Sequence, residues 1–404
     1  MSGLNLGLGY GVDFGGLAST VIPLTDNILA ANRAQIATSF QTIANSFTSR
    51  RSHWASPQGD ITNLQCVDCN WKYDITTFLP VGGSAYTIKK FIEYPANTFH
   101  QVKWAGATSK AISGGLQAKS DVVISSVTGL PLIIPAGTKF WERTVNIGGT
   151  VTNFPIQDMP ANCSTLGLDD GNSGSDLGNS GTIAATGTPN TFGCSAIVGS
   201  VAAANARGFV LVGDSIVYAT GDISSVGVKG GSGWLARWLD PLYPWVKMAC
   251  GGQSISDVAG SASAAPGNFL AAIGYTDTIF EHGINDLRLG RTQAQILADQ
   301  QTVYARYSGR KYQTTITTRT DTSNAYADVS GQTVKTDGNM AALNPLNNAI
   351  RALPAQLTGY IDGADFSMSA RDSDLWGGPF PPVTDGTHPT SAKAAAMAAI
   401  ATGI

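Results

Sequence analysis

The sequence predicts an α/β protein whose C-terminal half is a doubly wound, three-layer structure around a parallel sheet. A β-rich, sandwich-like region and an N-terminal helix are expected to precede it. Three observations support this reading. Between residues 207 and 404, continuously apolar runs such as Phe209–Val212 alternate with segments of helical periodicity, which is typical of a parallel sheet covered on both faces. Between residues 61 and 158, short strand-like segments end at Gly, Pro or Asn. Near the N-terminus, apolar residues recur at helical spacing.

Residues 1–60 are expected to form an N-terminal extension with a helix at about 26–48. Thr25, Asp26 and Asn27 are residue types that cap helices. The apolar positions that follow are separated by 7, 4, 3 and 4 residues and so share one helical face: Leu29, Ile36, Phe40, Ile43 and Phe47. Such a stripe packs either on its own domain or against a second copy of the chain, so the pattern leaves open a homo-oligomer through residues 26–48.

Residues 61–158 are expected to form a β-sandwich-like accessory domain. Ser84–Ile92 and Lys139–Val145 are among its predicted strands. The run from 133 to 144 reads as strand, tight turn and strand, and it resembles the small β-sandwich modules that accompany carbohydrate-active enzymes. Trp104 and Trp141 suit either the core of such a module or a platform for sugar rings. Residues 159–206 are rich in Gly, Ser, Asn and Thr, which predicts a linker or a long surface loop.

Composition and charge exclude several classes of partner. Only 13% of the 404 residues are charged, and the net charge is −3 with no basic block. Neither nucleic acid nor an anionic membrane surface is therefore expected as a partner, and no apolar window is long enough to span a bilayer. The 47 glycines and the polar turns are typical of secreted or particle-borne proteins, although residues 1–16 lack the pattern of a signal peptide. The expected location is extracellular or on a virion or similar particle.

The five cysteines do not predict a metal site or a disulfide scaffold. Cys66 and Cys69 form one C-x-x-C pair, but no second ligand pair follows at the spacing that structural zinc requires. Neither a metal nor another cofactor is expected. Cys163 and Cys194 flank the Gly/Ser-rich stretch and fit either a disulfide or two reduced thiols.

Reactive side chains follow the strands predicted in the C-terminal half, where sites of open parallel sheets lie. The four segments are Gly213-Asp214-Ser215, Cys250-Gly251-Gly252-Gln253-Ser254, His282-Gly283-Ile284-Asn285-Asp286 and Asp385-Gly386-Thr387-His388. A Ser, a Gly, an Asn and an Asp-x-x-His in this order resemble the four blocks of the SGNH hydrolases, also called GDSL esterases. The resemblance covers residues 207–404. It implies a serine esterase with the corresponding fold.

The same residues suit the chemistry individually. A serine hydroxyl needs an adjacent base, and His388 is a suitable one for Ser215. Asp385, three residues earlier, is placed to orient the imidazole. The resemblance further implies an oxyanion hole formed by the backbone N–H groups of Ser215 and Gly252 and the amide of Asn285. Gly251 is the neighbouring alternative to Gly252. One departure from the family is Ala219, where the family usually has Gly.

Three further residues are candidates for binding substrate. Trp376 and Phe380 lie in the Gly- and Pro-rich run at 375–382, which leads into Asp385 and is expected to form a wall of the cleft. Trp376 also fits a buried position between the last helix and the sheet. His282 either reaches the site or packs beneath it.

The expected function is removal of acyl groups, O-acetyl in particular, from a carbohydrate. The same blocks also occur in lipases and thioesterases. A structural, tail-fibre-like protein that binds glycans is the alternative from outside the enzymes.

Overall fold

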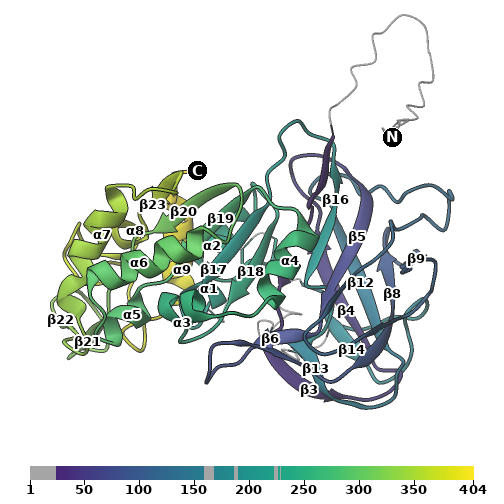
Figure 1. The fold of residues 1–404 in the computed structure, drawn as a ribbon, viewed down its shortest axis with the longest axis horizontal. Helices are drawn as coiled ribbons and strands as arrows, with labels where there is room; N and C mark the ends of the chain where they lie inside the picture. Colours follow the sequence, from purple (N-terminus) through teal and green to yellow (C-terminus); the bar gives the residue numbers. More distant parts are fainter. Residues whose placement is uncertain (1–23, 159–167, 186–189, 223–225, 228) are drawn as a thin grey trace, which may run out of the picture.

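The computed structural model describes residues 24–158, 168–185, 190–222, 226–227 and 229–404. It has a β-rich part, built mainly from the N-terminal half of the chain, and an α/β part built from the C-terminal half (Figure 1). The two parts lie side by side along the long axis of the molecule.

The α/β part is built around a six-stranded sheet in which every neighbouring pair is parallel. In spatial order its strands are β2 (Ala34–Gln35), β18 (Trp245–Ala249), β17 (Phe209–Gly213), β19 (Asp277–Glu281), β20 (Arg310–Thr314) and β23 (Gly359–Ile361). Every residue of β17 and β19 is buried, as expected for inner strands covered on both faces. The predicted parallel sheet of the C-terminal half is confirmed.

The β-rich part consists of antiparallel sheets. One contains β1 (Thr25–Leu29), β16 (Ala196–Val201), β5 (Ile61–Cys69) and β11 (Gln117–Lys119) in that order. A second contains β10 (Lys110–Ile112), β8 (Tyr86–Glu93), β12 (Lys139–Asn146), β4 (Thr48–Trp54) and β14 (Gly171–Ser173), with β9 (Phe99–Gln101) beside β8. A third contains β15 (Asn190–Thr191), β13 (Val151–Asp158) and β3 (Ser39–Ile43). Side chains from all three sheets meet in one apolar core, which includes Ile92, Phe154 and Ile197.

The β-rich part and the α/β part each also contain a small two-stranded hairpin. β6 (Trp71–Tyr73) pairs with β7 (Pro80–Gly82) in the β-rich part, and β21 (Thr320–Thr322) pairs with β22 (Gln332–Val334) in the α/β part. In Figure 1, β21 and β22 lie at the left end of the molecule near α5, and β6 lies below α4.

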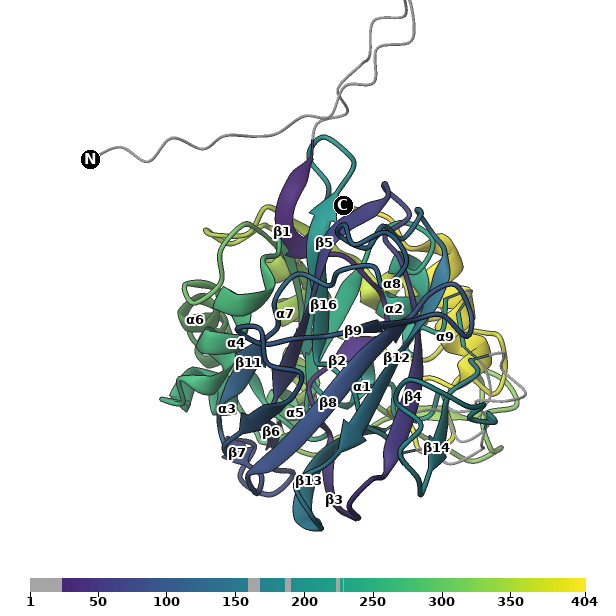
Figure 2. The ribbon, with the colours of Figure 1, turned by 90° about the vertical axis from the view of Figure 1, so that its right-hand side faces the viewer.

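Helices cover both faces of the parallel sheet (Figure 2). α2 (Trp234–Leu239), α8 (Gly363–Ser367) and α9 (Ser391–Ile400) pack together on one face, and α3 (Ile255–Gly260), α6 (Gln293–Tyr304) and α7 (Leu343–Arg351) on the other. The short helices α1 (Ser215–Tyr218) and α5 (Ile284–Arg288) begin just after β17 and β19, and a 3-10 turn (Met340–Ala342) precedes α7. None of the described helices is both long and apolar enough to cross a lipid bilayer.

The two parts share a core. α4 (Ala265–Ile273) packs on the sheet that contains β1, β5, β11 and β16. Trp71 of β6 contacts Phe269 of α4 with their rings nearly perpendicular, at a centroid distance of 6.4 Å. Val67 and Val198 belong to the same buried cluster as the strands of the parallel sheet. The β-rich part is therefore packed against the α/β part through apolar side chains.

The predicted helix at 26–48 is wrong. These residues form β1, β2 and β3, which belong to three different sheets, and β4 begins at Thr48. Asn27 and Arg33 have φ of 50° and 67°, in the left-handed region that interrupts a helix. Arg33 is buried and donates to Asp170 of the chain's later segment, with Nη1 3.0 Å from Oδ1. A surface helix would have left Arg33 in water, so long-range pairing overrides the local periodicity.

The apolar stripe is consequently not a seam between copies of the chain. Leu29, Ile36 and Ile43 are buried inside this molecule, in two different cores. The expectation of a homo-oligomer through a helix at 26–48 is therefore withdrawn.

The range 159–206 is not simply a linker. Residues 159–167, with Cys163, and 186–189 lie outside the described residues, but β14, β15 and β16 fall in this range. β16 is buried throughout and lies between β1 and β5. Its small residues are required by close packing: a methyl group on Gly199 would lie 2.8 Å from the carbonyl oxygen of Thr62. Gly199 therefore allows close packing between β16 and β5.

Candidate active site

Ser215 stands at the carboxyl end of the central strand β17, as the first residue of α1. The side chain of Asp214 caps this helix, and its Oδ1 accepts the backbone N–H of Ile216 at 2.9 Å. α1 turns back onto the strand so closely that a methyl group on Gly213 would lie 2.2 Å from the side chain of Val217. The sharp turn holds the Ser215 side chain at the sheet edge, where it is largely buried.

The departure at Ala219 has a structural context. Ala219 ends α1 with φ of 82°, a left-handed conformation that glycine adopts without strain. The family's glycine suits this backbone, and alanine occupies it here at a modest conformational cost.

His388 and Asp385 approach Ser215 from the loop before α9. His388 Nε2 lies 2.7 Å from Ser215 Oγ, and His388 Nδ1 lies 2.5 Å from Asp385 Oδ2. Asp385 Oδ1 accepts the backbone N–H groups of Thr387 and His388, each at 2.9 Å. Partial burial works to raise the pKa of Asp385, but these backbone bonds and the His388 ring outweigh it and lower the pKa. The structure thus brings together the three residues that the sequence predicts as nucleophile, base and orienting carboxylate.

The predicted oxyanion donors lie beside Ser215. Gly252 has φ of 81°, so its backbone requires glycine, and a methyl group there would lie 3.3 Å from the ring of Phe78. The N–H groups of Ser215 and Gly252 donate to no oxygen in the described part of the chain. Asn285 Nδ2 donates to Asp214 Oδ2 at 3.2 Å and to the carbonyl oxygen of Gln253 at 3.1 Å. Both bonds are long, so a negatively charged oxygen nearby competes with weak partners.

Two buried carboxyl groups connect the blocks. Asp214, held between Ile216 and Asn285, has its pKa raised to about 7, chiefly by burial. Asp286 accepts the backbone N–H of Ile255 at 2.9 Å and so fixes the start of α3 beside the second block. Burial raises the pKa of Asp286 to about 6.

Trp376 does not form the exposed wall that the sequence suggested. Its side chain is 0% exposed and packs with Tyr326 and Val383. Its Nε1–H donates to the carbonyl oxygen of Gly386 at 3.2 Å, between Asp385 and His388. Trp376 therefore supports the loop that carries Asp385 and His388, and its ring is not accessible to a ligand in the cleft.

Phe380 and His282 also lie away from the cleft. Phe380 is 40% exposed but does not line the cavity at Ser215. His282 is fully buried, with Nε2 3.4 Å from Gln253 Oε1, and burial lowers its pKa to about 3. His282 is thus a neutral residue beneath the site, because no water reaches the ring to stabilise its charged form.

A cleft of about 390 Å³ opens over Ser215. No large apolar side chain lines it; its lining residues are Ser215, Gly251, Gly252, Asn285, Arg288, Arg319, Lys335, Asp385, Thr387 and His388. The three cations among them were not anticipated from the sequence. Arg288 stands three residues after Asn285 on α5, a spacing that places both on one side of the helix and was a usable signal.

The β-rich part also reaches the site. In the turn between β6 and β7, Asp74 Oδ1 accepts the backbone N–H groups of Thr76 and Thr77, and this turn presents Phe78. The carbonyl oxygen of Phe78 accepts the side-chain amide of Gln253 at 2.9 Å. Phe78 therefore lies over Gly252. It also borders a second, more apolar cavity of about 310 Å³ that includes Val258, Leu270 and Tyr307.

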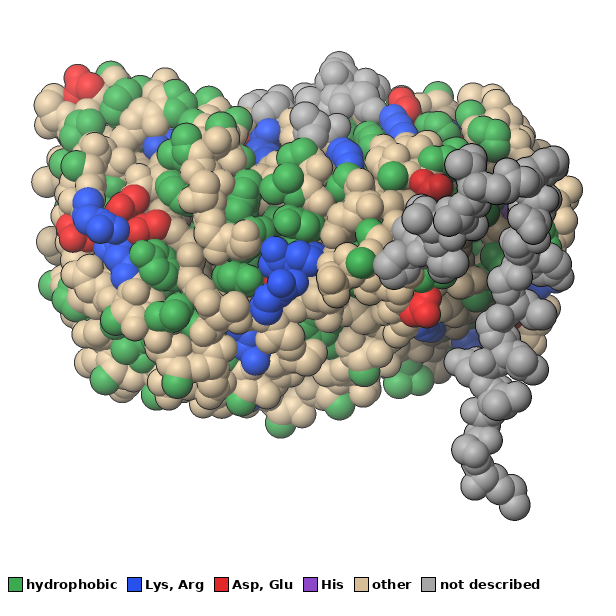
Figure 3. Space-filling model, turned by 90° about the horizontal axis from the view of Figure 1, so that it is seen from above, with side chains coloured by type: hydrophobic (Ala, Val, Ile, Leu, Met, Phe, Trp, Pro, Cys, Tyr) green, Lys and Arg blue, Asp and Glu red, His purple; other side chains and the backbone are tan. Residues whose placement is uncertain are grey.

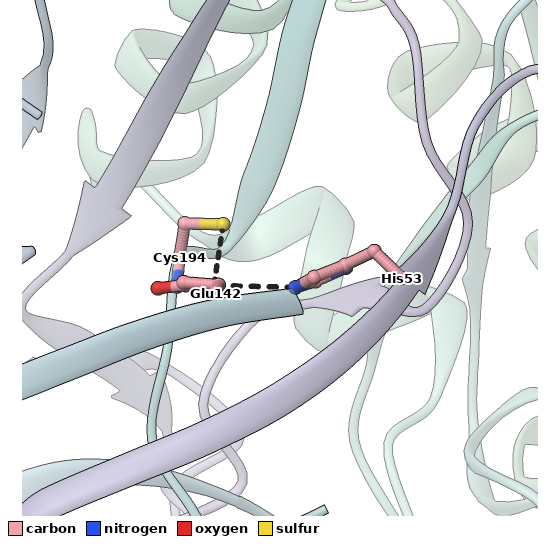
Figure 4. Close-up of side chains that lie close together, drawn as sticks. All are labelled: His53, Glu142 and Cys194. Atoms are coloured by element: carbon pink, nitrogen blue, oxygen red, sulfur yellow. Dashed lines mark hydrogen bonds and ion pairs between the residues drawn. The ribbon is translucent and has the colours of Figure 1, made fainter. Parts of the chain in front are cut away.

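The described residues contain one group with metal-ligand character, and it lies inside the β-rich part (Figure 4). His53 Nε2 is 3.2 Å from Glu142 Oε2, and Cys194 Sγ donates to the same oxygen at 3.0 Å. Glu142 Oε1 accepts Thr144 and the backbone N–H of Cys194, and it is ion-paired with Lys90. The carboxylate is thus satisfied by protein groups, and the cluster serves the packing of the β-rich part.

None of the cysteines that the structure describes takes part in a disulfide, and Cys163 lies outside the described residues. Cys66, Cys69 and Cys194 are buried free thiols, as is Cys250 beside Gly251. Burial raises the pKa of the Cys250 thiol to about 11, so it remains protonated at neutral pH.

Comparison with known proteins gives structural matches only. No protein-family model matches the chain, and no curated protein sequence matches it. An active-site mutant of a family two carbohydrate esterase from Clostridium thermocellum is 9% identical, with 93% of this chain and 95% of that chain covered and a TM-score of 0.34. A member of the lipolytic G-D-S-L family from Veillonella parvula is 16% identical, covering 48% of this chain and 95% of its own, with a TM-score of 0.35.

A third match, titled TesA, is 20% identical, covers 48% of this chain and 94% of its own, and has a TM-score of 0.32. Several of the matching structures are titled as G-D-S-L proteins. The GDSL/SGNH hydrolases are also the family whose four blocks the sequence resembles.

Proposed function

We propose that this protein is a serine esterase that removes O-acyl groups, acetyl in particular, from a carbohydrate. The observation that carries the proposal is the hydrogen-bonded chain from Ser215 Oγ through His388 to Asp385 at the floor of an open cleft. Each of these groups has the partner that nucleophilic ester hydrolysis requires.

In the first half of the reaction, Ser215 Oγ attacks the ester carbonyl carbon while His388 Nε2 takes the hydroxyl proton. Asp385 holds Nδ1–H and stabilises the imidazolium that forms, without taking the proton itself. The carbonyl oxygen becomes an oxyanion near the N–H groups of Ser215 and Gly252 and the amide of Asn285. Loss of one such donor raises the activation free energy by about 3 kcal/mol.

Collapse of the tetrahedral intermediate breaks the bond to the alcohol. His388 returns its proton to the departing sugar oxygen, which leaves the acyl group on Ser215. Water then attacks the acyl carbon while His388 takes one of its protons. Collapse of this second intermediate breaks the bond to Ser215 Oγ, His388 returns the proton to that oxygen, and the carboxylic acid leaves.

The cleft lining favours a hydroxylated, polar substrate over a long lipid chain. Among the described residues, those that line the cleft are glycines or have polar or charged side chains. An acetyl group needs little apolar surface of its own, whereas the sugar that carries it needs hydrogen-bonding partners. These features support the carbohydrate reading.

The direct test is Ser215→Ala, assayed on 4-nitrophenyl acetate and on an acetylated polysaccharide by acetate release. The variant should lose at least about 10⁴-fold in kcat/KM on both, because no nucleophile remains. Ser263→Ala, in the second cavity, is the matched control and should retain full activity. Wild-type protein that hydrolyses neither compound but binds the polysaccharide would instead support a glycan-binding structural protein.

A lipase or thioesterase is the second candidate, favoured by the apolar cavity behind Phe78. An acyl chain on Ser215 that passed over Gly252 would run toward Val258 and Leu270. The two candidates differ in chain-length preference. A carbohydrate deacetylase should hydrolyse 4-nitrophenyl acetate faster than the octanoate, and the reverse order would favour the lipid reading.

A further inference from the structure

The catalytic cleft concentrates positive charge in a chain that has little of it. The sequence contains 25 Lys and Arg in 404 residues, with a net charge of −3. On the face drawn in Figure 3, charged side chains are scattered among polar and hydrophobic ones. Yet Arg288, Arg319 and Lys335 all line the cavity over Ser215, which has Asp385 as its only lining carboxylate among the described residues.

Two of these cations already have carboxylate partners. Arg319 Nη1 donates to Asp337 Oδ2 at 2.7 Å, and Lys335 Nζ lies 3.3 Å from Asp321 Oδ1. Arg319 and Lys335 flank the hairpin of β21 and β22, where the backbone N–H of Lys335 donates to the carbonyl oxygen of Arg319 at 3.0 Å. This ladder holds both cations on one wall of the cleft.

Arg288 is different. Its side chain is exposed, lines the cleft and contacts no acidic side chain in the described part of the chain. It lies on α5 on the same side as Asn285, and both residues line the cavity that also contains Ser215 and Gly252. Opposite it, Arg319 Nε lies 3.3 Å from Thr387 Oγ1, beside the loop of Asp385 and His388. A substrate at Ser215 is thus bordered by cations from two directions.

We propose that the substrate is an acidic carbohydrate and that Arg288 binds a carboxylate of the sugar whose ester is cleaved. This inference rests on the proposed function and specifies its substrate class. A guanidinium presents two parallel N–H groups that match the two oxygens of a carboxylate, and an arginine without an internal partner gives up no existing ion pair on binding. Arg319 and Lys335 are already paired with Asp337 and Asp321, so Arg288 is the cation of the cleft that carries the proposal.

The position of Arg288 also separates its role from that of the catalytic residues. It touches neither Ser215 nor His388 in the hydrogen bonds of the site, so it acts on substrate binding and not on proton transfer. Its replacement is therefore expected to raise KM for anionic substrates and leave the reaction of neutral ones unchanged.

The test compares two acetyl esters that differ only in charge, 4-acetoxybenzoate and its methyl ester, in the full-length protein. Wild type should favour the anionic ester in kcat/KM. Arg288→Gln should raise KM for the anionic ester about tenfold, equivalent to one bidentate ion pair of modest strength, with kcat unchanged and the methyl ester unaffected. Arg371→Gln, an exposed arginine outside the cleft, is the control and should change neither substrate.

A polymer arm uses an O-acetylated polyuronate and the same polymer after methyl esterification of its carboxylates. Faster acetate release from the charged polymer, lost in Arg288→Gln, is the expected result. Equal rates on charged and neutral substrates would overturn the inference while leaving the esterase intact, whereas no hydrolysis of either small ester would overturn the proposed function itself. A preference for 4-acetoxybenzenesulfonate over the benzoate would overturn the assignment of a carboxylate and point to a sulfated sugar.

Discussion

Replacing Trp376 tests whether this residue supports the catalytic loop or contacts substrate. Its side chain is fully buried against Tyr326 and Val383, so Trp376→Ala removes a large ring from a closed environment. Such changes lower the free energy of unfolding by about 3–5 kcal/mol. Because Nε1–H also binds the Gly386 carbonyl between Asp385 and His388, the same variant should lower kcat on small and polymeric esters alike.

Trp376→Phe separates packing from hydrogen bonding. It keeps most of the ring volume but removes the bond to Gly386, whose carbonyl still accepts the backbone N–H of Thr320 at 3.0 Å. The loss should therefore be near 1 kcal/mol, with a smaller fall in kcat.

The measurements are denaturant unfolding of each variant and steady-state hydrolysis of 4-nitrophenyl acetate and an acetylated polymer. Phe380→Ala is the matched control, since Phe380 lies in the same loop, is 40% exposed and should change stability by less than about 0.5 kcal/mol. Unaltered stability of Trp376→Ala with a raised KM on polymer alone would refute the buried-support role and restore the ring as a cleft wall.

Three further predictions concern other parts of the site. Asp385→Asn should lower kcat about 10⁴-fold, because His388 is still present as a base although it is misoriented. His388→Ala removes the base and should lower kcat about 10⁶-fold. Equal losses in ester hydrolysis would contradict the assigned roles. Burial raises the pKa of Asp214 from 3.8 to about 7, so this carboxyl group binds its proton more tightly in the folded than in the unfolded state. Its contribution to the free energy of unfolding therefore falls as the pH rises from about 4 to 7, by at most about 4 kcal/mol. Asp214→Asn should accordingly gain stability relative to wild type between pH 4 and pH 8 in denaturant unfolding, and a constant difference would argue against this. Phe78→Ala should impair ester hydrolysis through the Gly252 loop although it lies in the β-rich part, and unchanged kcat/KM on 4-nitrophenyl acetate would show that the contact is incidental.

The parallel sheet and the catalytic constellation are predictable from sequence because their signals are local. The continuously apolar strand β17 leads directly to Ser215, the short apolar run in β19 leads to Asn285, and parallel strands deliver their carboxyl ends to one edge. Because β17, β18 and β19 are parallel neighbours, their carboxyl ends lie together, and this is enough to predict that the residues that follow them are close in space.

Burial of single loop residues is not predictable in this way. Trp376 is fixed by Gln332 of β22, whose side chain accepts the Trp376 N–H and donates to its carbonyl oxygen, each at 2.9 Å and 44 residues away in sequence. His282 is likewise buried through Gln253 from another block. The spacing of a loop does not reveal such partners.

The segment at 26–48 shows the same limit for secondary structure. Its apolar spacing fits a helix as well as it fits three short strands that bury residues in different sheets. What decides between them is Asn32 and Arg33, which are buried and donate side-chain hydrogen bonds to Asp240 and Asp170. These partners lie 208 and 137 residues away. Burying a cation without its carboxylate destabilises the fold by more free energy than helix propensity can contribute. Pairing with distant residues therefore determines the backbone conformation of this segment.

This pairing makes the β-rich part a component of the catalytic fold. Residues 34–35 supply an edge strand to the parallel sheet, beside β18. Trp71 and α4 join the two parts through a shared apolar core, and Phe78 contacts the loop of Gly252. Separating the parts would expose that core and remove the contact of Phe78 with the Gly252 loop at the same time. The geometry at Ser215 therefore depends on both halves of the chain, which a boundary drawn at residue 207 from composition does not convey.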